Sequence, residues 1–131
     1  QPVNYSRLES IINQLQPKTK ERFLIKVGDH YRSIPTSSID SFFILERSTF
    51  IQTATGKNYA IDHSLDKIEQ LVDPGIFFRI NRNCIVNYSA IRDIIAYSSS
   101  RLKLILNNQT EKEDMLVSRE RVTEFKGWMD R

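Results

Sequence analysis

The sequence predicts a mainly β domain built from hairpins, with about nine to ten short strands, a short internal helix and a C-terminal helix. Two observations predict this class. Short apolar or alternating stretches are separated by turn residues at the intervals typical of hairpins. Helical spacing of apolar residues recurs in only two segments after residue 22, which is too few for a fold of alternating strands and helices.

The first residues predict a separate amphipathic helix. Ser6 and Glu9 have capping-box spacing, and apolar residues recur at helical period from Leu8 to Leu15 before Pro17 ends the pattern. The polar stretch that follows has the composition of a linker. We therefore expect a linker helix and linker over residues 1–21 and the main domain over residues 22–131.

The strands of the main domain are predicted from apolar runs bounded by turn residues. Gly28 and Gly56 mark two of the hairpin turns, and Asn107 marks a later break. We expect strands at residues 23–27, 30–34, 39–45, 50–53, 58–61, 77–80, 84–87, 91–97, 101–106 and 115–117.

Two helices of the main domain are predicted from caps and apolar spacing. Ser64 is placed to cap a helix over residues 65–71, which Pro74 and Gly75 follow. Ser118 is placed to cap the last helix, whose apolar stripe runs from Val122 to Met129. A β domain flanked by short helices follows.

Composition excludes a membrane segment and leaves the partner open. The longest apolar runs, such as residues 42–45, are far too short to cross a bilayer. The net charge of +3 is compatible with nucleic acid but equally common in other proteins. The chain begins with Gln-Pro, and its first residues do not contain the apolar block typical of a signal peptide. Its one cysteine, Cys84, is interpreted as a buried apolar residue. We expect a piece of a longer cytoplasmic protein.

The sequence offers no catalytic, cofactor or metal motif. Its four glycines lack the spacing of a phosphate-binding loop or a dinucleotide fingerprint. His30 and His63, interpreted as surface residues, make no zinc site with one cysteine. The densest carboxylates, at residues 111–114, fit a solvated hairpin tip. We therefore expect no enzyme, no cofactor and no metal.

One polar interruption is the most informative feature. In residues 77–87, which read FFRINRNCIVN, strand alternation places Phe78 and Ile80 on one side and breaks at Arg82. We expect Arg82 to be exposed at a strand junction that apolar flanks hold rigid. An arginine carried in this way suits a DNA groove, because its guanidinium pairs with both the N7 and O6 acceptors of guanine.

The same stretch resembles the LytTR-type DNA-binding domain of bacterial response regulators. That family has a phenylalanine-rich strand, then Arg-x-His-Arg-Ser and an apolar strand ending in Val-Asn, whereas this chain has Asn81 and Asn83 in place of the histidine and serine. The similarity covers about residues 23–128. It includes residues 34–35 and 38–44, residues 46–51, the helix at 64–71, Ile91, and Val-Ser-Arg at residues 117–119.

The resemblance implies a stack of small antiparallel sheets whose loops enter successive major grooves. It implies base contacts from Arg82, Arg119 and Ser48. We expect backbone contacts or support for these three from Arg79, Asn81, Asn83, Arg47, Arg121 and Lys57, and possible phosphate contacts from Arg101 and Lys103. For Arg79 we favour a phosphate over a carboxylate partner, and for Asn87 a structural role. The two asparagines predict a somewhat different base preference.

The function expected from these residues is sequence-specific DNA binding. We interpret the chain as the output domain of a response-regulator transcription factor that binds promoter direct repeats, with a receiver or sensor domain upstream and two copies forming a homodimer on DNA. The alternative is a β-rich protein-interaction or ligand-sensing module without a nucleic-acid role, which the weak net charge and exposed strand edges permit.

Overall fold

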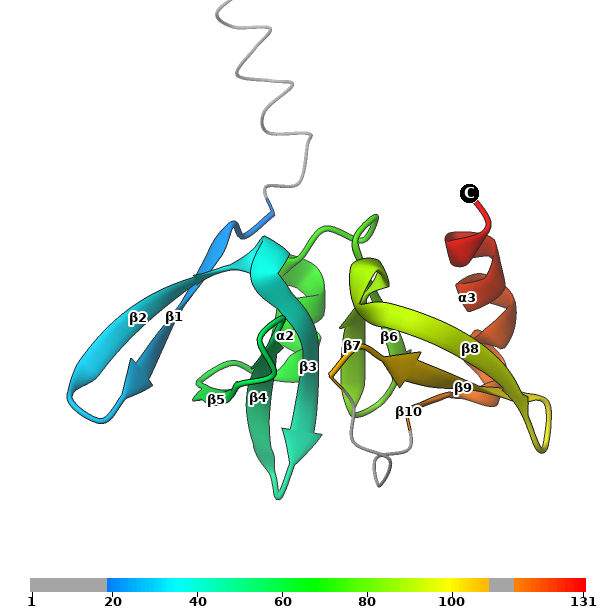
Figure 1. Cartoon of the computed structure of the whole chain (residues 1–131), viewed down its shortest axis with the longest axis horizontal. Coiled ribbons are helices and arrows are strands. Elements are labelled where there is room, and N and C mark those ends of the chain that lie inside the picture. The colour runs from blue at the N-terminus through cyan, green and yellow to red at the C-terminus, as the bar shows by residue number, and fades with distance from the viewer. Residues whose placement is uncertain (1–18, 109–114) are drawn as a thin grey trace, which may run out of the picture.

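The strands form three antiparallel sheets in a computed structural model that describes residues 19–108 and 115–131 (Figure 1). The elements are β1 (Arg22–Val27), β2 (His30–Pro35), η1 (Thr36–Ser38), β3 (Ile39–Leu45), β4 (Ser48–Thr53), β5 (Asn58–Ile61), α2 (Leu65–Leu71), β6 (Phe77–Asn81), β7 (Cys84–Asn87), η2 (Tyr88–Ala90), β8 (Ile91–Tyr97), β9 (Arg101–Leu106), β10 (Met115–Val117), η3 (Arg119–Arg121) and α3 (Val122–Met129). This architecture confirms the predicted fold class. The expected helix at residues 6–15 and the expected hairpin tip at 111–114 lie outside the described residues.

The largest sheet lies between the two smaller ones. Its five strands have the order β5-β4-β3-β7-β6, whereas β1 pairs with β2 and the third sheet has the order β10-β9-β8. In Figure 1 the β1–β2 ribbon extends to one side of this central sheet, and the third sheet lies with α3 on the other side. The central sheet can therefore contribute side chains to two cores.

The middle strands of the central sheet are buried on both faces, which explains their continuous apolar sequence. Ile85 of β7 belongs to the core shared with β1, β2 and α2, whereas Cys84 and Val86 belong to the core shared with the third sheet and α3. Phe77 and Phe78 of β6 divide between the two cores in the same way. Burial of Cys84 agrees with its interpretation as a small apolar residue.

Aromatic side chains fill both cores. In the first, the ring centroid of Phe23 lies 5.2 Å from that of Phe42. In the second, Phe78 contacts Phe125 and Trp128 of α3, with centroid distances of 5.5 and 5.3 Å. The indole nitrogen of Trp128 also donates a hydrogen bond of 2.9 Å to the carbonyl oxygen of Pro74, which fixes α3 beside the start of β6.

Only one of the two predicted helix caps is present. The Ser64 hydroxyl accepts a hydrogen bond of 3.1 Å from the backbone N–H of Lys67, as expected for α2. The Ser118 prediction is wrong, because the chain first makes the tight turn η3 and the Ser118 side chain makes no capping bond. Its backbone oxygen instead accepts from the N–H of Arg121 at 2.9 Å.

Two hairpin turns use residues other than glycine in the left-handed region. Glu46 and Arg47 have φ of 51° and 68°, and Ser99 and Ser100 have φ of 63° and 61°. Positive φ at both central residues matches the right-handed twist of the flanking strands. The tight Glu46–Arg47 turn lets Ser48 pair with Leu45, so β4 begins two residues earlier than the sequence predicted.

The described residues before β1 are bonded to the main body. The N–H of Lys20 donates to the carbonyl oxygen of Leu71 at 2.6 Å, and the oxygen of Glu21 accepts from the N–H of Thr36 at 2.8 Å. The first bond connects the segment before β1 to the end of α2, and the second joins that segment to the residue after β2. The division between residues 21 and 22 stays a prediction.

Candidate nucleic-acid interface

The β6–β7 turn presents two polar residues on a rigid base. Arg82 and Asn83 are exposed, while Ile80 and Cys84 on either side are buried in the second core. The Asn81 side-chain oxygen accepts a hydrogen bond of 2.7 Å from the N–H of Asn83. An asparagine that bonds the backbone two residues on replaces the glycine or proline of an ordinary tight turn, so the turn needs neither.

The β3–β4 turn lies at the same end of the central sheet. Phe43 of β3 pairs with Cys84 of β7, and the N–H of Ile44 donates a 2.9 Å hydrogen bond to the carbonyl oxygen of Asn83. The following turn carries Arg47 and Ser48, both exposed, at the lower tip of the β3–β4 hairpin in Figure 1. This backbone bond connects the β6–β7 turn to β3, two residues before the β3–β4 turn begins.

A third segment joins this end through the third sheet. The N–H of Ser118 donates to the oxygen of Ile80 at 2.9 Å, and the Asn81 side-chain nitrogen donates to the oxygen of Leu116 at 2.8 Å. These bonds place the β10–η3 junction beside the β6–β7 turn. Arg119 extends from the junction, exposed, with its Nε donating to the oxygen of Ser99 at 3.1 Å.

We call these three segments together the loop end: residues 46–48, 82–83 and 118–121. The loop end holds four arginines and two glutamates, a local excess of positive charge in a chain of net charge +3. Arg82, Arg119 and Ser48, the residues expected to contact bases, all belong to it. Side chains far apart in the sequence are thus presented by turns that backbone bonds tie together.

Arg79 supports the loop end from within. One terminal nitrogen, Nη1, donates to the carboxylates of both Asp66 and, at 2.9 Å, Glu69. Its Nε donates to the oxygen of Asn81 at 3.2 Å, and its second terminal nitrogen donates to the oxygen of Arg82 at 2.8 Å. The side chain is 13% exposed. Burial lowers the pKa of Arg79, but its hydrogen bonds and charge interactions with the two carboxylates outweigh burial and raise the pKa.

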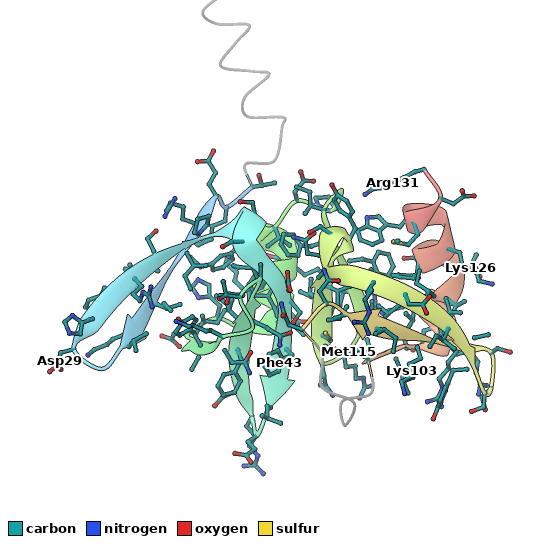
Figure 2. All side chains as sticks on the ribbon, in the orientation of Figure 1. Asp29, Phe43, Lys103, Met115, Lys126 and Arg131 are labelled. Atoms are coloured by element: carbon teal, nitrogen blue, oxygen red, sulfur yellow. The ribbon has the colours of Figure 1, made fainter. Side chains whose placement is uncertain are left out.

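Among the hollows that adjoin the loop end in the described part of the chain, two lie beside Arg82 and Arg119. The larger, about 660 Å³, is lined by Arg82, Asn83 and Arg121, with Phe43 and Met115, labelled in Figure 2, contributing apolar surface. The smaller, about 420 Å³, is lined by residues that include Arg101 and Arg119. Arg121 also donates to the oxygen of Arg79 at 3.3 Å, so two expected phosphate ligands, Arg101 and Arg121, lie near the base-contact candidates.

Lys57 and Asn87 lie at the opposite end of the central sheet. The first residue of β4, Ser48, belongs to the loop end. The last residue of β4, Thr53, pairs with Ile39 at the other end of the strand, and Lys57 follows it in the chain. A strand of six residues spans about 20 Å, so Lys57 is not brought together with the other candidates. Asn87 donates to the oxygen of Ile39 at 3.1 Å and accepts from the N–H of Ser89 at 3.0 Å. These contacts agree with the structural role expected for Asn87.

The two histidines differ in how far their side chains are buried. His30 is exposed, as interpreted from the sequence. His63 is half-buried with its ring edge-on to Phe23 at 5.9 Å, so its interpretation as a surface residue is wrong. The described residues contain no cluster of histidine, cysteine and carboxylate side chains that could hold a metal ion.

Comparison with known proteins gives the family. The model of the family described as the LytTr DNA-binding domain matches residues 29–130. The chain belongs to this family. The resemblance seen in the sequence is therefore confirmed, and the match covers all three segments of the loop end.

A solved structure has the same fold as this LytTr domain. The LytTr DNA-binding domain of a methyl-accepting/DNA response regulator from Bacillus cereus has 22% sequence identity and a TM-score of 0.74, and the alignment covers 86% of this chain and 99% of that one. At this identity the likeness establishes the fold. No curated protein matched the chain. Among the described residues, no helix of this LytTr domain is both long and apolar enough to span a bilayer.

Sequence reasoning missed two residues near the loop end of this LytTr domain. Asp66 and Glu69 are the carboxylate partners of Arg79, and neither was singled out. Their spacing of three residues on a predicted helix places them on one face, and this was the available signal. Whether Asp66 and Glu69 reach Arg79 depends on how α2 packs against β6, and no local sequence pattern predicts that packing.

Proposed function

We propose that this LytTr domain is the sequence-specific DNA-binding output domain of a bacterial response-regulator transcription factor, and that its loop end enters the major groove. Arg82 and Arg119 are the proposed base contacts, with Ser48 the third. Arg47, Arg121 and Arg101 are the proposed phosphate contacts. Asn83 completes the exposed part of the central turn.

The observation that carries this proposal is the backbone connection among the three segments. The bond from Ile44 to Asn83 joins the β6–β7 turn to β3, close to the β3–β4 turn, and the bond from Ser118 to Ile80 joins the β10–η3 junction to β6, close to the β6–β7 turn. These bonds support a fixed relation among the three segments before any ligand binds. Groups that are already ordered lose little conformational entropy on binding, which favours selective recognition. Exposed arginines on such turns combine a fixed base with a long side chain able to reach base edges.

Electrostatics favours the same face. Among the described residues Arg82 makes no ion pair, and the arginines outnumber the glutamates at the loop end. Neutralising phosphates with such residues releases counterions and makes binding depend strongly on salt. A mildly basic protein whose loop end carries more arginines than glutamates suits a duplex better than a neutral surface does.

The test is selection of duplexes from a randomised pool, followed by mobility-shift titration at two salt concentrations. We expect Arg82→Ala to lose about 1 to 3 kcal/mol of discrimination at one base position. Arg92→Ala is the matched control, because Arg92 is an exposed arginine on β8 outside the loop end. Selection of the same sequences with the same affinities by wild type and Arg82→Ala would contradict the base-reading role.

Promoter direct repeats, two copies on DNA and an upstream receiver or sensor domain are further parts of the proposal. Footprinting on fragments selected from the source genome will give the repeat spacing, and the mass of the complex will give the number of copies bound. We expect two copies per pair of repeats. Absence of any salt-sensitive binding to the selected pool would favour the alternative, a protein-interaction or ligand-sensing module.

A further inference from the structure

Arg79 connects helix α2 to the β6–β7 turn through four acceptors. Two are the carboxylates of Asp66 and Glu69 on α2, and two are the backbone oxygens of Asn81 and Arg82. We call this arrangement the Arg79 clamp. A guanidinium presents its donors in a rigid planar fork, so it can bond several acceptors in fixed directions at once.

We propose that Asp66 and Glu69 are positioning residues for base reading by Arg82, acting through the Arg79 clamp. The inference rests on the proposed function. The carboxylates bond one side of the guanidinium. Its other side donates to the backbone oxygens of Asn81 and Arg82, which belong to the peptide groups before and after Arg82. The direction in which the Arg82 side chain leaves the turn is thereby set from α2, a helix that contributes no residue to the loop end.

The carboxylates are needed because the Arg79 charge is mostly removed from water. Its side chain is 13% exposed, whereas those of Asp66 and Glu69 are 82% and 47% exposed. Ion pairs this exposed add little to stability. Without these carboxylates, burying the unpaired guanidinium costs free energy, so the side chain turns toward water or a DNA phosphate. The turn carbonyls then lose their donors.

The inference predicts an effect opposite in sign to simple electrostatics. Carboxylates near DNA repel phosphates, so neutralising them should tighten the binding of every sequence. If Asp66 and Glu69 position Arg82, neutralising them instead weakens binding to the preferred sequence while other sequences are bound as well as before or better. Specificity falls although the protein becomes more positive.

A substitution that keeps the charge separates positioning from phosphate binding. Lysine carries the same charge as arginine but places it at a point with three rotatable donors, so Arg79→Lys cannot hold two carboxylates and two carbonyls together. Lysine does serve well as a phosphate ligand. Arg79→Lys should therefore lose specificity if Arg79 is a clamp and should keep affinity if it contacts a phosphate.

The experiment measures binding of the full chain to two duplexes by fluorescence anisotropy. One duplex is the sequence that wild type selects most strongly from a randomised pool, and the other is its scrambled version. The variants are Asp66→Asn/Glu69→Gln and Arg79→Lys. The control is Glu124→Gln/Asp130→Asn, which makes the same charge change at exposed residues of and after α3.

We expect both clamp variants to lower the ratio of selected to scrambled affinity about tenfold, the size of one base contact. The control should leave this ratio unchanged while both affinities rise together. A ratio equal to that of wild type in the carboxylate variant, or affinities that rise in parallel as in the control, would overturn the inference.

Amide hydrogen exchange without DNA keeps this outcome separate from the fate of the proposed function. The N–H of Asn83 bonds within the turn, so its exchange should accelerate in both clamp variants while the free energy of unfolding stays near that of wild type. Unchanged exchange at Asn83 overturns the inference whatever DNA does. Failure of wild type to bind any duplex overturns the proposed function, and the inference with it.

Discussion

Asn81→Ala tests how the central turn is built. The substitution removes the acceptor for the N–H of Asn83 at 2.7 Å and the donor to the oxygen of Leu116 at 2.8 Å. A typical hydrogen bond contributes about 0.5 to 1.5 kcal/mol net. Asn83 is exposed, so its N–H regains water and the first loss is near the low end of that range. We expect the free energy of unfolding to fall by about 1 to 2 kcal/mol.

Asn81→Asp separates the two bonds. The carboxylate keeps the acceptor for Asn83 but places a charge against the oxygen of Leu116 in place of a donor. We expect a loss of stability at neutral pH that shrinks as pH falls through the ordinary range of an aspartate, because a protonated carboxyl donates again. The pH dependence is measured against wild type at each pH.

Chemical denaturation followed by circular dichroism measures these losses. Asn83→Ala is the matched control, because the described structure uses the backbone of Asn83 and gives its side chain no hydrogen bond. The control should stay within about 0.5 kcal/mol of wild type. If Asn81→Ala proves no less stable than Asn83→Ala, the asparagine does not hold the turn and this account is wrong.

Two other residues give predictions of opposite kinds. Arg47 has φ of 68°, a strained conformation for a residue with a side chain, so Arg47→Gly should raise the free energy of unfolding by up to about 1 kcal/mol in a denaturation experiment. The same variant should bind DNA more weakly in mobility-shift titration. A lower free energy of unfolding would contradict backbone strain at Arg47. Burial raises the pKa of Asp40, against a smaller lowering by its hydrogen bond from Asn108. The folded state therefore binds this proton more tightly than the unfolded chain, so ionisation costs stability above the folded pKa and the cost disappears below the unfolded one. Asp40→Asn should be more stable than wild type at pH 7 and equal to it near pH 3, and equal stability at both would count against the burial effect.

The strands could be predicted because each hairpin carries its own local signals. Alternation and turn residues located all ten strands within a few residues, including the one at Cys84–Asn87, which the structure buries on both faces. The Glu46–Arg47 turn was less visible, since neither residue favours positive φ and only the pairing of β3 with β4 enforces it.

The candidate site was predictable where it depended on strand ends and not where it depended on packing. Arg82 could be placed at an exposed junction because its apolar flanks define two strands. The sequence favoured a phosphate partner for Arg79, whereas the structure gives it the carboxylates of Asp66 and Glu69. The choice depended on the position of α2 against β6, which the sequence does not give. Lys57 failed to join the site for a similar reason: sequence distance does not say which end of a sheet a turn occupies.

The bonds between the segments of the loop end join backbone to backbone, from Ile44 to Asn83 and from Ser118 to Ile80. Such bonds are independent of the side chains that the turns carry. Substitutions at Ser48, Arg82 or Arg119, the proposed base contacts, can therefore be made while these backbone bonds persist. If the domain reads DNA as proposed, changes at these tips should give new base preferences on an unchanged frame, and the domain should serve as a scaffold for libraries randomised at those positions.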